Sequence, residues 1–305
     1  MNFETVANQY LQELETGSNP CRPSTLSSYR SAIRTHLTPR FGSMELSELA
    51  TQNNRVLKEL VRDLRAKYKP ASVRLIVTLF KSVTDCPRDD NGVRLFKTEW
   101  NNDFIDLPAV LPAEQRAPMI PTDELNAVVT SHRDSLLFAV LGGTGMRVGE
   151  CLALRQADWD RKAGILFVRA GKTASAVREI DLAQALNERM QAGIPADQDR
   201  LFPGSMTFYR SRAEGVTGFA HSFRRFRLTH LRRVGAPEDL LRFWLGHASQ
   251  SVSDRYSRIR CDREFRREQA EKAGLGFTLT EQSVNDSAPQ TGENANLESE
   301  PTCHA

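Results

Sequence analysis

The sequence lacks long apolar runs and paired cysteines. No stretch of ~18 consecutive apolar residues occurs among its 305 residues, so we expect no membrane-spanning helix. The start, MNFETVANQY, lacks the basic and then apolar segments of a secretory signal. The 5 cysteines include no C-x-x-C pair, which argues against a disulfide framework or a cysteine-rich zinc site and favours a reducing cytosol. Glycine (18) and proline (14) are too scarce for a collagen-like or low-complexity chain.

Charge is unevenly distributed along the chain. The formal net charge is +3, but five acidic residues and no lysine or arginine follow residue 277. The part before that point therefore holds 41 basic and 33 acidic residues, a net charge of +8. A basic body favours a polyanionic partner such as nucleic acid, although a solvated basic surface would explain the charge equally well. The segment 278–305 is polar and nearly free of aromatics, so we expect a disordered acidic tail.

Residues 1–105 have the pattern of a small helical domain. Apolar residues recur at helical spacing in four stripes, which are Phe3–Leu14, Leu26–Leu37, Leu57–Leu64 and Val73–Phe80. About four helices can form one bundle. Residues 106–121 contain four prolines and no clear period, so we expect them to form an interdomain linker.

Residues 122–277 form the expected second domain, which is mainly α-helical with a small β-sheet. An apolar helix at Leu136–Leu141 is interrupted by the glycines of residues 142–145 and resumes at MRVGECLAL. Ile165–Val168 and Val177–Ile180 have the pattern of two strands around GKTAS, which indicates a short hairpin. The remaining pattern is helical to about Ala273.

Four fragments of this second domain carry reactive residue types in one order. They are TGMRVGE (144–150), GKTASAVREIDL (171–182), HSFRRF (221–226) and LGHASQSVSDRYSR (245–258). In order and spacing they resemble the catalytic domain of the tyrosine recombinases, the phage-integrase and Xer-type family. The family's catalytic pattern falls on Arg147, Glu150, Lys172, His221, Arg224, His247 and Tyr256.

The resemblance covers roughly residues 3–275, and the N-terminal helices resemble the family's SAM-like, core-site DNA-binding domain. It implies a compact two-domain type without an additional arm-binding domain. Two features depart from the family pattern. Arg225 and Phe226 follow the second arginine where a histidine and a threonine are common, and the linker lacks the usual Asn-Pro ending.

The resemblance implies attack by a tyrosine oxygen on a DNA phosphodiester, which leaves a 3′-phosphotyrosine and a free 5′-hydroxyl. Tyr256 would be the nucleophile. Arg147 and Arg224 would hold the non-bridging oxygens, because each guanidinium can donate two parallel hydrogen bonds to the charge of the transition state. Lys172, at the tip of the hairpin, would protonate the leaving oxygen as a general acid. Lys162 is the less favoured alternative, because it lies in the turn before the hairpin.

Three further residues are expected to assist. His221 would exchange a proton with Tyr256, and His247 would hydrogen-bond a phosphate oxygen, since imidazole can do either near neutral pH. A structural histidine is the alternative reading, whereas the spacing of the histidines excludes the usual zinc patterns. Glu150 lies one helical turn after Arg147 and would position catalytic groups, unless the two form an ordinary surface pair.

Two further residues of reactive type are weaker candidates for a catalytic role. Tyr209 is the nearest alternative nucleophile, but it precedes the H-x-x-R fragment, which contradicts the family order. His230 lies on the same expected helix as His221, and we expect it to be a packing or surface residue.

Several basic residues are expected to bind DNA phosphates, which would position the protein without reading sequence. These expected contacts are Arg22, Arg30, Arg34, Lys69, Arg74, Arg225, Arg227, Arg255 and Arg258.

The resemblance implies a site-specific recombinase that acts on double-stranded DNA without metal, ATP or another cofactor. Four protomers would assemble on two DNA sites, with a monomer or dimer when free, in the cytoplasm at the nucleoid and not at a membrane. A relaxing enzyme like the type IB topoisomerases and a recombinase-like DNA-binding regulator are the alternatives.

Overall fold

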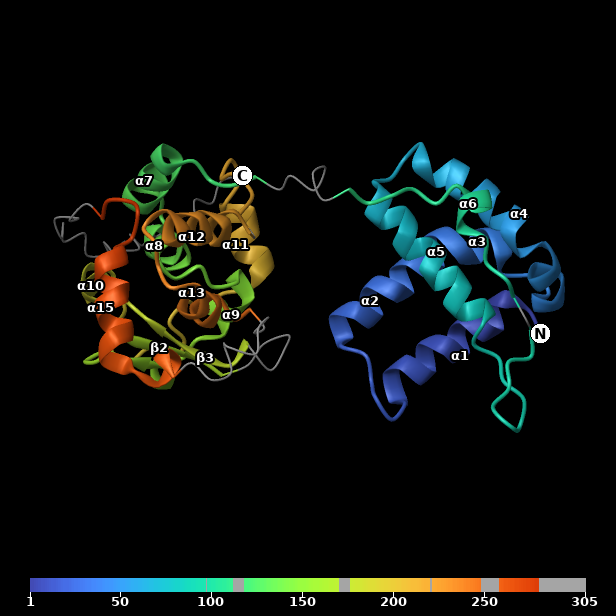
Figure 1. Cartoon of the computed structure of the whole chain (residues 1–305), viewed down its shortest axis with the longest axis horizontal. Helices are drawn as coiled ribbons and strands as arrows, with labels where there is room; N and C mark the ends of the chain where they lie inside the picture. The colour runs from blue at the N-terminus through green and yellow to red at the C-terminus, as the bar shows by residue number, and fades with distance from the viewer. Residues whose placement is uncertain (97, 112–117, 170–175, 220, 248–257, 280–305) are drawn as a thin grey trace, which may run out of the picture. The chain divides into compact units, whose positions relative to one another are not determined.

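The computed structural model describes residues 1–96, 98–111, 118–169, 176–219, 221–247 and 258–279. Contacts divide the chain into two units, Met1–Arg116 and Ala117–Ala305, which we call the N-terminal and C-terminal units (Figure 1). Residues 280–305 of the expected tail, the hairpin tip with Lys172, and the segment with Arg255 and Tyr256 lie outside the described residues.

The N-terminal unit is helical, as its apolar stripes predict. Its elements are α1 (Phe3–Thr16), α2 (Pro23–Ala32), the π-helical turn η1 (Ile33–Leu37), α3 (Thr38–Phe41), α4 (Leu46–Arg65), α5 (Pro70–Thr84) and α6 (Asn102–Ile105). Local sequence determines several helix starts. Asn2 caps α1 by accepting a hydrogen bond from the Thr5 amide at 2.9 Å, and proline begins both α2 and α5, where no amide hydrogen is needed.

An aromatic cluster holds the N-terminal unit together. The rings of Phe3 and Phe80 stack with centroids 5.5 Å apart, and Phe41 meets Phe80 edge-on at 4.9 Å. All three side chains are buried. The start of the expected linker also packs on this unit, because the Arg65 guanidinium pairs with Asp106.

The C-terminal unit combines helices with a small sheet, which confirms the expected fold class. Its helices are α7 (Thr122–Ser131), α8 (Ser135–Thr144), α9 (Val148–Ala153), η3 (Gln156–Asp158), α10 (Gln184–Gly193), α11 (Met206–Arg212), α12 (Ser222–Arg233), α13 (Glu238–Leu245), η5 (Ile259–Cys261) and α15 (Arg263–Ala273). None of the helices in the described ranges is long and apolar enough to cross a membrane.

The sheet has three antiparallel strands in the order β1-β2-β3. They are β1 (Trp159–Asp160), β2 (Ile165–Val168) and β3 (Arg178–Asp181). The pairing of Val168 with Arg178 closes the described part of the hairpin, so the expected strand pair is confirmed. The sequence pattern did not show β1, because two residues are too few for an alternating pattern to be read.

One expectation for this unit was wrong in its bounds. The interruption falls at Gly145, and α9 resumes the helix at Val148. Gly142 and Gly143 do not interrupt α8, which continues to Thr144. The reason is packing: a Cβ on Gly143 would lie 2.6 Å from Cδ2 of Leu186, so glycine lets another helix approach α8 closely. Gly145 has a φ of 68°, a left-handed conformation that favours glycine.

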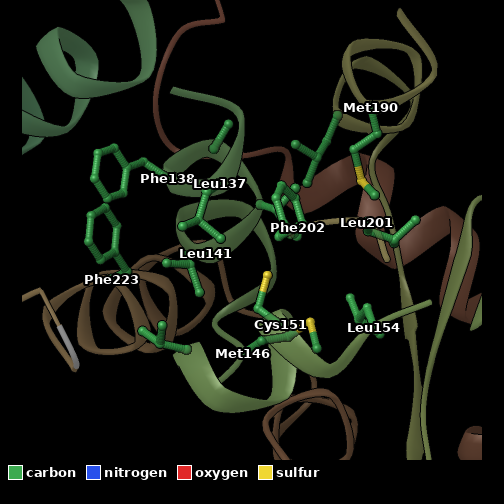
Figure 2. Packing of buried hydrophobic residues seen from close by; sticks show 14 of the residues in the cluster. Leu137, Phe138, Leu141, Met146, Cys151, Leu154, Met190, Leu201, Phe202 and Phe223 are labelled. Carbon is green, nitrogen blue, oxygen red and sulfur yellow. The ribbon is translucent and has the colours of Figure 1, made fainter. Parts of the chain in front are cut away.

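The core of the C-terminal unit lies between α8 and its neighbours (Figure 2). Phe138 of α8 and Phe223 of α12 stack in parallel with centroids 5.4 Å apart, and both are buried. Cys151 of α9 is also buried in this cluster, and burial raises the pKa of its thiol. The stacked pair fixes the first turn of α12 against α8. This turn carries Arg224 and directly follows His221.

Replacing Phe138 with alanine tests whether the two units have separate cores. The substitution should lower the free energy of unfolding of the C-terminal unit by about 3–5 kcal/mol, because it leaves a cavity and removes the stacked partner of Phe223. Native-state hydrogen exchange should show lost protection in α8 and α12 but not in α4 and α5. Phe80→Ala should give the opposite pattern, and equal losses in both units from either variant would contradict separate cores.

Candidate active site

Arg224 lies in the first turn of α12, and the backbone of two other elements holds its guanidinium. Its Nη1 donates to the Gly145 carbonyl at 3.0 Å, and its Nη2 donates to the Leu245 carbonyl. Burial, together with the positive charge of Arg147, lowers the pKa of Arg224 to about 10. The guanidinium therefore remains charged at neutral pH, and it lies close enough to Arg147 for the two charges to interact.

Arg147 immediately precedes α9 and is held by Glu150 in the first turn of that helix. Its Nη1 donates to Glu150 Oε1 at 2.7 Å, and its backbone amide donates to Oε2 at 3.1 Å. The Glu150 side chain is 6% exposed whereas that of Arg147 is 36% exposed. The pair is therefore not the ordinary surface pair that was the alternative expectation, since the carboxylate is buried and only the guanidinium reaches solvent.

Glu150 also accepts a hydrogen bond from Nη2 of Arg178, at 2.9 Å. Burial alone would raise the pKa of Glu150, but the hydrogen bonds and charges of Arg178 and Arg147 outweigh it and hold the pKa below its usual value. The carboxylate is thus ionised at neutral pH, as a group must be that pairs with two guanidinium ions.

The two expected histidines share these arginine neighbours. His221 occupies the N-cap position of α12 without a capping hydrogen bond from its side chain, and His247 follows Gly246 at the end of α13. Partial burial lowers the pKa of both rings, and the positive charges of Arg224 and Arg147 lower each further. The hydrogen bonds of Arg224 to the Gly145 and Leu245 carbonyls bring the described members of the expected catalytic set together. The lowered pKa of each ring favours the neutral imidazole at pH 7.

The two lysines considered as general acid, Lys172 and Lys162, both belong to the segments that connect strands of the small sheet. β2 and β3 form the arms that lead to Lys172, which itself lies outside the described residues. Lys162 lies in the turn between β1 and β2, where its backbone amide donates to Asp160 Oδ1 at 3.1 Å. Lys172 remains a prediction.

Tyr209 and His230 have structural partners. The Tyr209 hydroxyl donates to the Pro203 carbonyl at 2.8 Å, and burial raises the pKa of this tyrosine. Both effects disfavour its use as a nucleophile. His230 lies 2.7 Å from the Ala273 carbonyl and stacks over Phe226, which agrees with the expected packing role.

The expected phosphate contacts differ in their surroundings. On the N-terminal unit Arg22, Arg30, Arg34, Lys69 and Arg74 are exposed, and Arg258 is exposed on the C-terminal unit. Among the exposed members, Arg30 pairs with Glu15 at 3.1 Å and Arg74 donates to the Pro108 carbonyl at 3.2 Å. Arg225 donates to the Pro118 carbonyl at 3.1 Å.

Arg227 corrects an expectation. Its side chain is buried, with 4% of the residue exposed, and its guanidinium donates to the Gly274 carbonyl. A guanidinium enclosed in this way cannot reach a phosphate on the protein surface, so Arg227 is removed from the expected DNA contacts.

Sequence reasoning missed Arg178 and the polar residues around it. The fragment after Lys172 was interpreted only as a strand, although an arginine at an inward-facing position of a short strand is an unusual choice that needs a buried anion. Trp244 belongs to the same group, because its indole donates to Asp181 Oδ2 at 2.7 Å. Arg266 pairs with the same carboxylate at 3.0 Å.

Comparisons with known proteins agree with this geometry. The sequence model of the phage integrase family matches residues 115–263, and that of the phage integrase N-terminal SAM-like domain matches residues 2–55. The chain is 24% identical over 294 residues to the tyrosine recombinase XerA of Thermococcus onnurineus, covering 88% of this chain and 96% of that protein. It is 27% identical over 244 residues to XerA of Pyrococcus furiosus, covering 70% and 78%.

Two solved structures share the fold at low sequence identity. The Tn1549 transposon integrase in complex with transposon right end DNA superposes with a TM-score of 0.62 at 15% identity, covering 84% of this chain and 98% of that one. A lambda integrase tetramer bound to a Holliday junction superposes with a TM-score of 0.55 at 17% identity, covering 85% and 78%. The two family models together match segments of both units, the SAM-like segment in the N-terminal unit and the integrase segment in the C-terminal unit. The chain belongs to the phage integrase family, the tyrosine site-specific recombinases.

Replacing Gly145 with alanine tests the backbone that holds Arg224. The left-handed conformation and the approach of Leu245, whose Cδ2 would lie 2.7 Å from the new Cβ, should cost at least about 1–2 kcal/mol of unfolding free energy. Urea unfolding measures this loss. Gly149→Ala is the matched control, because its Cβ would meet no atom within 4 Å and should stabilise α9 by about 0.5–1 kcal/mol. Equal stability of the two variants would contradict the described geometry.

Proposed function

We propose that this recombinase breaks and rejoins double-stranded DNA through a 3′-phosphotyrosine on Tyr256. The observation that carries the proposal is the convergence of Arg147, Arg224, His221 and His247. Arg224 lies three residues after His221 and donates to the carbonyls of Gly145 and Leu245, which lie two residues before Arg147 and His247. Two guanidinium groups beside two neutral imidazoles suit a phosphodiester, whose non-bridging oxygens gain negative charge in the transition state.

The proposed cleavage step balances without a co-reactant. The Tyr256 oxygen forms a bond to phosphorus, and the bond from phosphorus to the 5′-oxygen breaks. His221 takes the tyrosine proton, while Lys172 gives a proton to the leaving 5′-oxygen. Because one phosphodiester replaces another, the bond energy is kept in the phosphotyrosine, and reversal of the step rejoins DNA without ATP.

Charge stabilisation in this proposal comes from the protein itself. Arg147 and Arg224 bind the non-bridging oxygens, His247 donates a hydrogen bond to one of them, and Glu150 keeps Arg147 in place. No metal or redox cofactor enters any of these steps. The exposed arginines and lysine of the expected phosphate contacts, without Arg227, would hold the duplex.

The partner is proposed to be duplex DNA bound by four protomers on two sites. Support comes from the relatives in fold, since the Tn1549 integrase structure contains transposon DNA and the lambda integrase structure is a tetramer on a Holliday junction. We place the reaction at the nucleoid, where such a substrate is found.

Covalent trapping tests the nucleophile. Wild-type protein incubated with a nicked suicide duplex from the flanks of its native locus should give a protein–DNA band that survives denaturing electrophoresis. Tyr256→Phe should abolish the band, and Tyr209→Phe should retain it. Binding without any band would favour a DNA-binding regulator, and relaxation of a plasmid that lacks recombination sites would favour a topoisomerase-like enzyme. A band that persists in Tyr256→Phe would show that another residue is the nucleophile.

Arg224→Lys tests the proposed phosphate clamp, which is formed by Arg147 and Arg224. Lysine keeps the charge but cannot contact the Gly145 and Leu245 carbonyls while also donating to phosphate, so the cleavage rate should fall about 100- to 1,000-fold. Single-turnover cleavage gives the rate, and fluorescence anisotropy with the same duplex should show a much smaller change in affinity. Arg232→Lys, at the other end of α12, is the control and should cleave at the wild-type rate. A cleavage loss matched by the loss of affinity would contradict a role in the transition state.

A further inference from the structure

Arg178, the first residue of β3, makes contacts that exceed the needs of a strand residue. Its side chain is 1% exposed. Nε donates to the Trp244 carbonyl at 2.7 Å, Nη1 to the Ala176 carbonyl at 2.7 Å, and Nη2 to Glu150 Oε2 at 2.9 Å. Each nitrogen of the guanidinium therefore holds a different part of the C-terminal unit.

The contact with Glu150 connects Arg178 to Arg147. Glu150 divides its two oxygens, because Oε1 accepts from the Arg147 guanidinium while Oε2 accepts from Arg178 and from the Arg147 amide. Arg178 thus restrains the carboxylate that orients Arg147. A change in the position of Arg178 would rotate the carboxylate and move the exposed guanidinium.

The contact with the Trp244 carbonyl connects Arg178 to His247. Arg178 holds the carbonyl of Trp244, and Arg224 holds the carbonyl of Leu245, the next residue. These carbonyls belong to the last turn of α13, whose end carries no further intrahelical donors. His247 follows two residues later, so two neighbouring arginine contacts fix the turn from which its ring projects.

We propose that Arg178 is a positioning residue for strand cleavage, which acts on Arg147 through Glu150 and on His247 through the Trp244 carbonyl. The inference rests on the proposed function of the same site. Arg178 does not touch DNA in this proposal. It also begins the strand that follows Lys172, so the base of the hairpin and the phosphate clamp have one common anchor.

The ionisation state of Glu150 distinguishes a positioning role of Arg178 from a purely structural one. Arg147 and Cys151 on its own segment, Arg178 from β3 and Arg224 from α12 are the charged and titratable groups that interact with it. Removing Arg178 leaves the burial of Glu150, which raises its pKa, and deletes the hydrogen bond that most strongly lowers it. A protonated Glu150 no longer balances Arg147, so cleavage should be lost on the acidic side of neutrality in such a variant.

Single-turnover cleavage of the suicide duplex from pH ~5 to ~8 is the test, with full-length wild type, Arg178→Met and Arg178→Lys. Arg178→Met should cleave about 10- to 100-fold more slowly at neutral pH, as supporting residues of reactive groups commonly do. Its rate should fall further as the pH drops, at values where the wild type is still active. Arg178→Lys should recover part of the cleavage rate at acidic pH, because it restores a positive charge beside Glu150.

Arg266→Met is the matched control. It removes another buried arginine that contacts β3, through Glu179 and Asp181, but it does not contact Glu150. It should lower the stability of the unit and leave the pH profile of cleavage per folded molecule unchanged. A wild-type profile in Arg178→Met, or the same acidic shift in Arg266→Met, would overturn the proposal.

A second measurement does not depend on cleavage. Carbon-13 NMR titration of the Glu150 carboxyl should show a higher pKa in Arg178→Met than in wild type, and no rise in Arg266→Met. If the wild type forms no DNA adduct, the proposed function fails and this titration alone decides whether Arg178 controls the carboxylate. An unchanged Glu150 pKa in Arg178→Met would overturn the positioning role in either case.

Discussion

The candidate site depends on one buried carboxylate shared by two arginines. An unpaired carboxylate and an unpaired guanidinium are both costly to bury, and each is tolerated here because the other is present. Glu150 pairs with Arg147 on one side and with Arg178 on the other, yet these arginines differ in exposure, at 36% and 1%. One carboxylate therefore presents a guanidinium to solvent while it neutralises part of the charge of a second guanidinium that never leaves the interior.

Arg224 is held by a different means, which keeps its charge available. Its partners are the carbonyls of Gly145 and Leu245, which are neutral acceptors. Gly145 and Gly246 both have positive φ values and end α8 and α13, so unpaired helix carbonyls are free to bind it. A carboxylate in their place would also fix the guanidinium but would neutralise part of its charge, as Glu150 does for Arg147.

Much of the fold could be predicted from the sequence, because it depends on local order and spacing. The helical stripes of the N-terminal unit and the β2–β3 hairpin are of this kind, whereas Arg147 and Arg224 were singled out together by the resemblance to the tyrosine recombinases. The buried state of Arg227 is not of this kind, since its partner Gly274 lies 47 residues away in the sequence. Arg178 was missed for the same reason: spacing shows which residues share a strand, but it does not show which distant carboxylate and carbonyls enclose a side chain.

The arginines also determine how the histidines respond to substrate. Partial burial lowers the pKa of His221 and His247, and the positive charges of Arg147 and Arg224 lower it further. In the proposed reaction a phosphodiester binds between these arginines and brings the opposite charge. Negative charge beside an imidazole raises its pKa. In that proposal the phosphodiester makes His221 a better proton acceptor, which couples activation of the tyrosine to the presence of the bond that it attacks.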